Sequence, residues 1–218
     1  MEVKAVFVDA AGTLLRPREP VGITYARHAR LAGHAADPFQ VEARFRRVLT
    51  QNKGRPQQGD GRAYWRPIVA EALEITDETV FESLYQWYAA PKAWWVDTEA
   101  LRVLGRLARE GVHLGIISNW DTRLRILYAR FALDRMFPTL LCSAEVEVEK
   151  PDPWIFHMAC RCAGVRPREA IHIGDDPQAD VEGATAAGLV GLQVDEDLGW
   201  ASVPERVAAV RRMPMFWG

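Results

Sequence analysis

Residues 3–15 read VKAVFVDAAGTLL. The first six are apolar apart from one lysine and rich in valine, which predicts a buried strand that ends at Asp9. Gly12 permits a tight turn soon after that strand. A carboxylate can attack phosphorus and form a covalent intermediate, so this stretch predicts a nucleophile at the end of the first strand.

Four more apolar runs of strand length occur later in the chain, at 113–118, 139–142, 170–173 and 189–194. Helical patterns accompany them, at 97–110, 121–132, 151–163 and 177–187. Strands that alternate with helices predict a mainly parallel sheet with helices on both faces, and such sheets carry their sites at the carboxyl ends of the strands. We therefore expect an α/β fold with a Rossmann-like, doubly wound parallel sheet.

Residues 16–96 do not follow this alternation. They indicate four helices without a strand signal, at 20–33, 37–52, 61–74 and 77–90. An insertion directly after the first strand would lie over the strand ends as a lid. We predict a core domain of residues 1–15 and 97–218 and an inserted, all-helical cap domain of residues 16–96, with hinges at Pro17, Pro20 and residues 91–95.

Several aromatic residues belong to this predicted cap or to its second hinge: Trp65, Trp87, Tyr88, Trp94 and Trp95. Large aromatic side chains most often fill the core of a domain, so cap core is the favoured interpretation. A cage around a substrate is the alternative.

Polar residues stand at the ends of two later elements. Ser118 and Asn119 end the strand at 113–118, where a hydroxyl and backbone N–H groups can hold phosphoryl oxygens. Lys150 directly precedes Pro151 at the expected start of a helix. The helix dipole disfavours a cation there, so a partner anion would explain the lysine.

A cluster of carboxylates follows the strand at 170–173. Asp175, Asp176 and Asp180 come just after Gly174, and oxygen ligands of this kind suit Mg²⁺. The cluster predicts a magnesium site at the same edge of the sheet as Asp9. His172 alternates within the strand itself, so we expect it to be packed rather than catalytic.

These motifs, in this order, resemble the haloacid dehalogenase superfamily of hydrolases, and the resemblance covers nearly the whole chain. The segment 16–96 is similar to the helical C1-type cap of one subclass. The stretch DAAGTLLR, followed by Pro20-Val21-Gly22 and then Tyr25-Ala26, resembles a subgroup related to the rhythmically expressed gene product.

The resemblance implies a role for each motif residue. It makes Asp9 the nucleophile and, together with Asp175 and the backbone carbonyl of Ala11, a ligand of Mg²⁺. Lys150 would neutralise Asp9 and the charge of the phosphoryl group. The remaining residues would bind the transferring group (Ser118 and Asn119) or support the site (Gly12, Thr13, Asp176 and Asp180).

Position 11 departs from the family pattern, because phosphatases of the family carry their general acid/base there and this chain has alanine. The favoured function is still a Mg²⁺-dependent phosphatase of a small phosphorylated metabolite. Three alternatives stay open: a phosphonoacetaldehyde-hydrolase-like enzyme using Lys53 as a Schiff-base amine, a haloacid dehalogenase, and a non-enzymatic binding or regulatory protein that keeps the fold.

Composition limits the partners. The chain has 218 residues with a formal charge of −2, which argues against nucleic-acid binding, and no apolar run suggests a membrane span. No secretory signal is visible and three cysteines are expected to be reduced, so we expect a cytoplasmic protein. The predicted partner is a small phosphorylated molecule, and the oligomeric state is left open.

Overall fold

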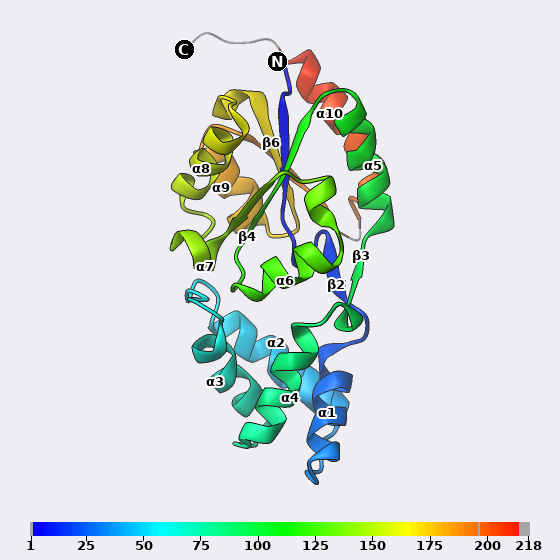
Figure 1. The fold of residues 1–218 in the computed structure, drawn as a ribbon, viewed down its shortest axis with the longest axis vertical. Helices are drawn as coiled ribbons and strands as arrows, with labels where there is room; N and C mark the ends of the chain where they lie inside the picture. Colours follow the sequence, from blue (N-terminus) through cyan, green and yellow to red (C-terminus); the bar gives the residue numbers. More distant parts are fainter. Residues whose placement is uncertain (1, 196, 214–218) are drawn as a thin grey trace.

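A computed structural model describes residues 2–195 and 197–213. Its central sheet has five parallel strands in the order β5-β4-β1-β6-β7 (Figure 1). They are β1 (Ala5–Val8), β4 (His113–Ser118), β5 (Thr139–Cys142), β6 (Ala170–Gly174) and β7 (Val190–Gln193). Each strand expected from the sequence is present, and their parallel order confirms the doubly wound α/β fold.

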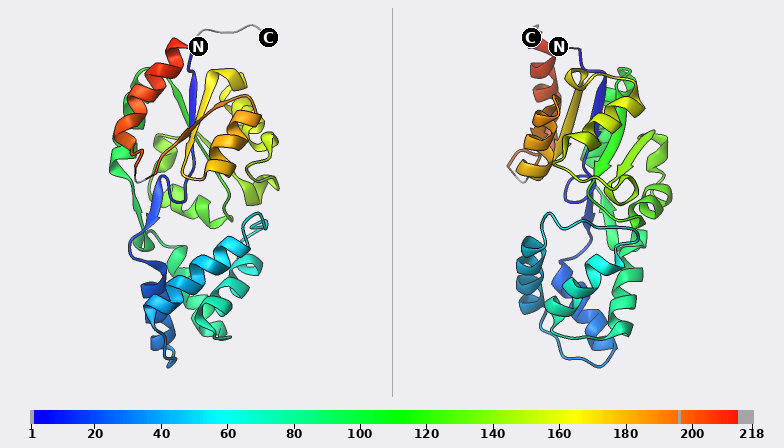
Figure 2. Two further views of the ribbon diagram at one scale, coloured as in Figure 1. Left: turned by 180° about the vertical axis from the view of Figure 1, so that it is seen from behind. Right: turned by 90° about the vertical axis from the view of Figure 1, so that its left-hand side faces the viewer.

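Helices cover both faces of the sheet (Figure 2). Alternate side chains of β1 enter two different apolar clusters, one on each face of the sheet. Val6 and Val8 pack with α5 (Thr98–Arg109) and α10 (Val203–Arg212). Ala5 and Phe7 pack with α8 (Pro153–Ala163) and α9 (Gly183–Ala186). Both faces of the strand are therefore buried, which explains its near-continuous apolar sequence.

Four helices lie beyond the carboxyl ends of these strands (Figure 1). They are α1 (Val21–Leu31), α2 (Pro38–Gln51), α3 (Arg62–Leu73) and α4 (Glu78–Tyr88). They share an apolar core of their own, built around residues such as Val41, Ile68 and Leu84. Asp37 and Asp77 cap α2 and α4 by accepting backbone N–H groups, so these two helices begin where the sequence supplies an aspartate.

A short antiparallel ribbon joins the four helices to the sheet domain. It pairs β2 (Leu15–Pro17) with β3 (Trp94–Val96). The expectation of no strand between residues 16 and 96 was therefore wrong at both ends of that segment. Strands of three residues are too short to show an alternating pattern, and pairing between segments almost eighty residues apart stabilises them.

Two expected helices differ in detail. The helix expected at 151–163 begins at Pro153 with Asp152 as its cap, so Lys150 lies in the preceding loop and not in the first helical turn. The helix expected at 177–187 is a π-helical turn, Pro177–Glu182, followed by α9. Such turns are frequent at functional sites.

Three further helices connect or flank the strands. They are α6 (Arg123–Arg130), which starts two residues later than expected, and α7 (Ser143–Val146) and α10, which were not expected. In α10 the apolar spacing of Val203, Val207 and Val210 was a usable signal. Every helix within the described residues is too short or too polar to cross a lipid bilayer.

Candidate active site

Lys150 lies at the centre of a buried charged cluster at the carboxyl ends of β1, β4 and β6. Its Nζ donates hydrogen bonds to Oδ1 of Asp9 at 2.6 Å, to Oδ1 of Asp180 at 2.6 Å and to the carbonyl of Ile117 at 2.8 Å. The lysine is 4% exposed. All three of its donors are satisfied, so the ammonium can remain charged although it is removed from water.

Ser118 and Asn119 hold the cluster from the end of β4. The Ser118 hydroxyl, which is fully buried, donates to Oδ1 of Asp9 at 3.0 Å. The Asn119 amide donates to the backbone carbonyl of Lys150 at 2.7 Å and accepts from its N–H at 2.8 Å. The sequence placed both residues at the transferring group; here the Asn119 side chain is engaged in positioning the backbone of Lys150.

The turn after β1 packs against the loop after β6. Thr13 donates from Oγ1 to Oδ1 of Asp175 at 2.7 Å. Gly12 has φ +82°, and a Cβ there would lie 2.5 Å from Oδ2 of Asp175. Any other residue would push the carboxylate away, so the glycine is required by both its conformation and this close approach.

Three carboxylates converge beside Lys150. Asp9, Asp175 and Asp180 each offer an oxygen, and these atoms lie within 4.8 Å of one another. Asp180 is already occupied: Oδ1 accepts from Lys150 and His172, and Oδ2 accepts the N–H of Asp176 at 3.0 Å. This leaves Asp9 and Asp175 as the carboxylates best placed to bind a divalent cation, whose preferred ligands are oxygens.

The neighbours of these buried carboxylates make them electrostatically unequal. Burial, opposed by the charge of Lys150 and assisted by Asp180 and Asp175, raises the pKa of Asp9 to about 7. Burial also raises the pKa of Asp175. Burial acts in the same direction on Asp180, but the charge of Lys150 and the hydrogen bond from His172 hold its pKa below the usual range. A cation between Asp9 and Asp175 would favour their ionised forms.

His172 supports this arrangement from within β6. Its Nε2 lies 2.8 Å from Oδ1 of Asp180, and the ring packs against Phe156. Burial lowers the pKa of His172, so the neutral ring donates from Nε2 to the carboxylate. The sequence correctly suggested a packed histidine, but the contact with Asp180 depends on the π-helical turn and was not foreseen.

Asp176 lies apart from the three carboxylates. It caps the π-helical turn by accepting the N–H groups of Gln178 and Ala179. Its Oδ2 also pairs with Nζ of Lys53 at 2.7 Å. Asp176 therefore links the core to the loop between α2 and α3.

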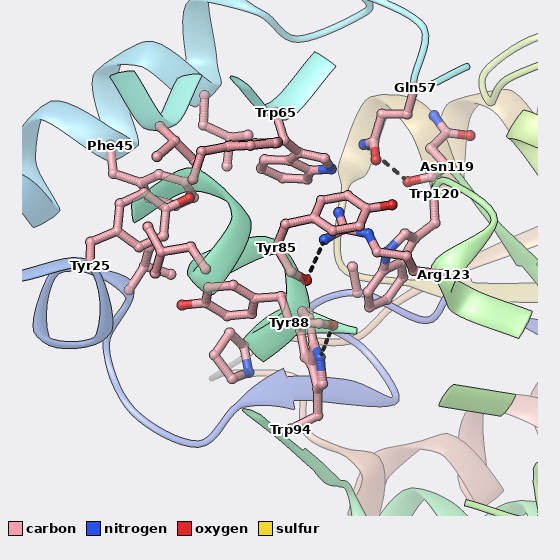
Figure 3. Close-up of a pocket in the computed structure, with 18 residues that line it drawn as sticks. Tyr25, Phe45, Gln57, Trp65, Tyr85, Tyr88, Trp94, Asn119, Trp120 and Arg123 are labelled. Carbon is pink, nitrogen blue, oxygen red and sulfur yellow. Dashed lines mark hydrogen bonds between the residues drawn. The ribbon is translucent and has the colours of Figure 1, made fainter. Parts of the chain in front are cut away.

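A pocket of about 290 Å³ lies between the four-helix cap and the sheet domain and is bordered by Ala11, Gly12 and Asn119 (Figure 3). Figure 3 shows Tyr25 and Phe45 on one side of this pocket and Trp120 and Arg123 on the other. The other lining residues are mostly apolar or aromatic: Pro17, Val21, Leu49, Gln57, Trp65, Val69, Phe81, Leu84, Tyr85, Tyr88 and Trp94.

The aromatic residues expected in the cap core or in a substrate cage occupy different positions. Trp65, Tyr88 and Trp94 line the pocket, and the first two also pack against the cap core. Trp87 packs partly buried beside the sheet-domain core, with the cations of Arg27 and Lys92 over its ring. Trp95 is more exposed than the others. Core packing and pocket lining are thus combined in the same side chains.

A buried ion pair joins the core to the cap beneath this pocket. Arg123 donates from Nε and Nη2 to the two carboxylate oxygens of Asp121, each at 2.8 Å. Trp65 of α3 donates from Nε1 to the same carboxylate at 2.9 Å, and Arg123 donates to the carbonyl of Tyr85 at 3.3 Å. Sequence reasoning missed this pair, for which the only local signal was two opposite charges two residues apart, shortly after Asn119.

Comparison with known proteins decides the family. The family model for haloacid dehalogenase-like hydrolases matches residues 3–188. The chain belongs to this family. Its human relative, haloacid dehalogenase-like hydrolase domain-containing protein 3, is 30% identical, with 94% of this chain and 89% of that protein covered. The Drosophila melanogaster rhythmically expressed gene 2 protein is 28% identical over 88% of this chain and 83% of its own length, which agrees with the subgroup suggested by the sequence.

A partial relative and a solved structure complete the comparison. Phosphoserine phosphatase from Thermus thermophilus is 40% identical, but only over 46% of this chain and 41% of that protein. The crystal structure of a HAD phosphatase from Thermococcus onnurineus superposes with a TM-score of 0.69 at 21% identity, covering 94% of this chain and 98% of that one. At this identity the likeness shows the shared hydrolase fold alone.

In this member of the hydrolase family, Ala11 presents a methyl group at the position where the sequence resemblance implied a carboxylate. Ala11 is exposed to the pocket that it lines. Among the described lining residues no aspartate, glutamate or histidine replaces the missing acid. The described walls of this pocket therefore carry no carboxyl or imidazole group.

Lys53, the candidate Schiff-base amine, lies outside this pocket. Its side chain is 54% exposed, and its ammonium is paired with Asp176. It lines a second, more open pocket together with Lys150, Glu149 and Arg55. The same loop contacts the core through the N–H of Gln57, which donates to Glu149 at 3.1 Å.

Proposed function

We propose that the protein is a Mg²⁺-dependent phosphatase that transfers the phosphoryl group of a small monoester to Asp9 and then to water. The observation that carries this proposal is the hydrogen-bonded set of Asp9, Lys150 and Asp180, with Asp175 beside it at the carboxyl ends of the strands. This set combines a carboxylate nucleophile with a fixed positive charge, which are the two components that displacement at a phosphate dianion requires.

Each residue of the set has a part in the proposed reaction. The Asp9 carboxylate attacks phosphorus, and the Ser118 hydroxyl and Lys150 ammonium, both bonded to Oδ1, hold it in one orientation. Lys150 offsets negative charge that develops on the phosphoryl oxygens. Asp180 and His172 keep the lysine in place. Asp9, Asp175 and the carbonyl of Ala11 would hold Mg²⁺, which neutralises phosphate charge and favours the ionised nucleophile.

One relative and the position of Lys53 favour phosphoryl transfer. One relative is named a phosphoserine phosphatase, although it aligns with less than half of this chain. Lys53, which a phosphonoacetaldehyde-hydrolase-like mechanism would need as a free amine, is ion-paired with Asp176 and lines the second pocket, not the apolar one. The buried Asp9–Lys150–Asp180 set lies at the carboxyl ends of the parallel strands, where α/β sheets carry their sites, which favours a functional site over a purely structural role.

A substrate panel tests the proposal. p-Nitrophenyl phosphate, a 2-haloacid and phosphonoacetaldehyde should be offered with Mg²⁺ and with a chelator, to the wild-type protein and to Asp9→Asn. We expect phosphate release from the first compound only, dependent on Mg²⁺ and lost in the variant. Chloride release, turnover of phosphonoacetaldehyde with or without Mg²⁺, or no turnover of any compound would refute it.

A further inference from the structure

The pocket beside Ala11 is electrically neutral. Arg123 is the one charged side chain among its described lining residues, and Asp121 neutralises it through two hydrogen bonds of 2.8 Å. The guanidinium also donates to the carbonyl of Tyr85, so its third nitrogen is occupied as well. Burial raises the pKa of Tyr25 and Tyr88, so both phenols stay uncharged. The walls therefore offer no free cation to a carboxylate.

The pocket is also placed and sized for the organic part of a substrate. It is bordered by Ala11 and Asn119, which adjoin the nucleophile loop and Ser118 in the chain. Its volume is about 290 Å³. Since an apolar cavity of roughly 150 Å³ can bind benzene, this space suits one or two rings. Aromatic walls such as Trp65, Tyr88 and Trp120 favour flat apolar groups.

The lack of an acid at position 11 also favours aromatic substrates, because it limits which leaving groups can depart. Protonation by a general acid contributes roughly 10²- to 10⁴-fold, and an alkoxide leaving group depends on it. A phenolate is a far weaker base and departs without that help. The neutral aromatic pocket and the absent proton donor are independent features, and both favour the same compounds.

We propose that the substrates are phosphate monoesters of uncharged phenols, that is, aryl phosphates whose ring occupies the pocket beside Ala11. This inference rests on the proposed phosphatase function and specifies its substrate class. An oxygen of Asp9 bonds to phosphorus while the bond from phosphorus to the phenolic oxygen breaks, and its electron pair leaves with the phenolate. The phenolate takes a proton from water. A second water then attacks phosphorus, releasing inorganic phosphate and restoring the Asp9 carboxylate.

Three substrates of similar size test the neutral pocket and the missing proton donor separately. Phenyl phosphate should exceed 4-carboxyphenyl phosphate in kcat/KM by at least about tenfold, because the pocket would bury an unpaired carboxylate. The carboxylate makes the phenol more acidic, so a poorer leaving group cannot cause the loss. Phenyl phosphate should exceed cyclohexyl phosphate by roughly 10²-fold or more, since only the latter releases an alkoxide. Equal or reversed preference in either pair overturns the inference while leaving a phosphatase.

A charge placed at the pocket rim provides a second test. Leu49 of α2 lines the pocket and is 36% exposed, so Leu49→Arg adds a cation without burying it. The variant should raise kcat/KM for 4-carboxyphenyl phosphate relative to phenyl phosphate by about tenfold. Phe39→Arg is the matched control, because it adds the same charge to the same helix at a site that is 85% exposed and outside the pocket. If both variants change the ratio equally, the pocket does not select the ring.

Binding without turnover separates failure of this inference from failure of the proposed function. In Asp9→Asn protein, 2-naphthol should quench tryptophan fluorescence saturably, because Trp65, Trp94 and Trp120 line the pocket. 6-Hydroxy-2-naphthoate should bind at least about tenfold more weakly. Selective naphthol binding by the variant, together with no phosphate release by the wild-type protein, would refute the phosphatase proposal but support the ligand class. Equal binding of both compounds, or none, overturns the ligand class.

Discussion

The charged cluster around Lys150 and the aromatic pocket beside Ala11 are neighbours of opposite character. In the cluster, Lys150, Asp9 and Asp180 are buried and joined by hydrogen bonds of 2.6 Å. The pocket is nearly free of net charge and gains its shape from segments of both the cap and the core. The first region is suited to hold one reacting group in one geometry, whereas the second is suited to select the organic group attached to it. Chemistry and selectivity are thus built from different physical interactions, and variants in each region should differ in effect.

The largest effect is expected for the nucleophile. Asp9→Asn should lower turnover of p-nitrophenyl phosphate by at least about 10⁴-fold, because an amide cannot replace the attacking carboxylate. Phosphate release measured with Mg²⁺ present is the assay. Circular dichroism and a thermal melt should show a retained fold, and activity near the wild-type level would mean that Asp9 is not the nucleophile.

Removing the central cation should be costly for stability. Lys150→Met leaves Asp9 and Asp180 buried without their shared partner, so we expect about 3–5 kcal/mol less free energy of unfolding. Urea denaturation measures this change. In Lys150→Met combined with Asp180→Asn part of the loss should return, because the second change removes one uncompensated charge. A double variant less stable than the single one would argue that the cluster is not held by charge.

Restoring a carboxylate where the two regions meet sharpens the contrast between them. Ala11→Asp should raise kcat for alkyl phosphates by up to about 10²-fold and for p-nitrophenyl phosphate far less, because protonation matters most for a poor leaving group. The gain requires a carboxyl with a raised pKa, and crowding near Asp9 and Asp175 acts in that direction while a bound cation opposes it. An equal change with both substrates would rule out a missing proton donor as the cause.

The smallest effect is expected in the wall of the pocket. Trp65→Phe keeps an aromatic ring but removes the N–H that donates to Asp121 at 2.9 Å. The two hydrogen bonds from Arg123 remain, so the free energy of unfolding should fall by only about 1 kcal/mol. KM for aryl phosphates should rise while kcat changes little. A loss of kcat as large as that of Asp9→Asn would show that pocket and cluster do not act separately.

Much of the fold could be predicted because its signals are local. Each of the five sheet strands is an apolar run of the expected length, and the aspartates Asp37, Asp77 and Asp97 mark the starts of helices. The ribbon of Leu15–Pro17 and Trp94–Val96 was missed because three-residue strands carry no periodicity. The π-helical turn at Pro177–Glu182 was also missed, because its pattern does not differ from that of an ordinary helix.

The candidate site, like the fold, could be predicted only in part. Asp9, Asp175 and Asp180 were named because they follow strands of a parallel α/β fold, whose carboxyl ends converge, and Lys150 was named from its place before a helix and from the family resemblance. The partners of Asn119 and His172 were not foreseen. A hydrogen-bond partner depends on side-chain direction, which spacing along the chain does not specify.

The sequence by itself determined the fold family, the order of the motifs along the chain and the presence of alanine, not an acid, at position 11. Only the tertiary structure decided that Arg123 is neutralised by Asp121 and that Trp65, Tyr88 and Trp120 enclose a neutral space next to Ala11. A motif is read from the identity and spacing of a few residues in the chain. A pocket arises from the packing of distant segments, and its charge depends on which side chains meet there.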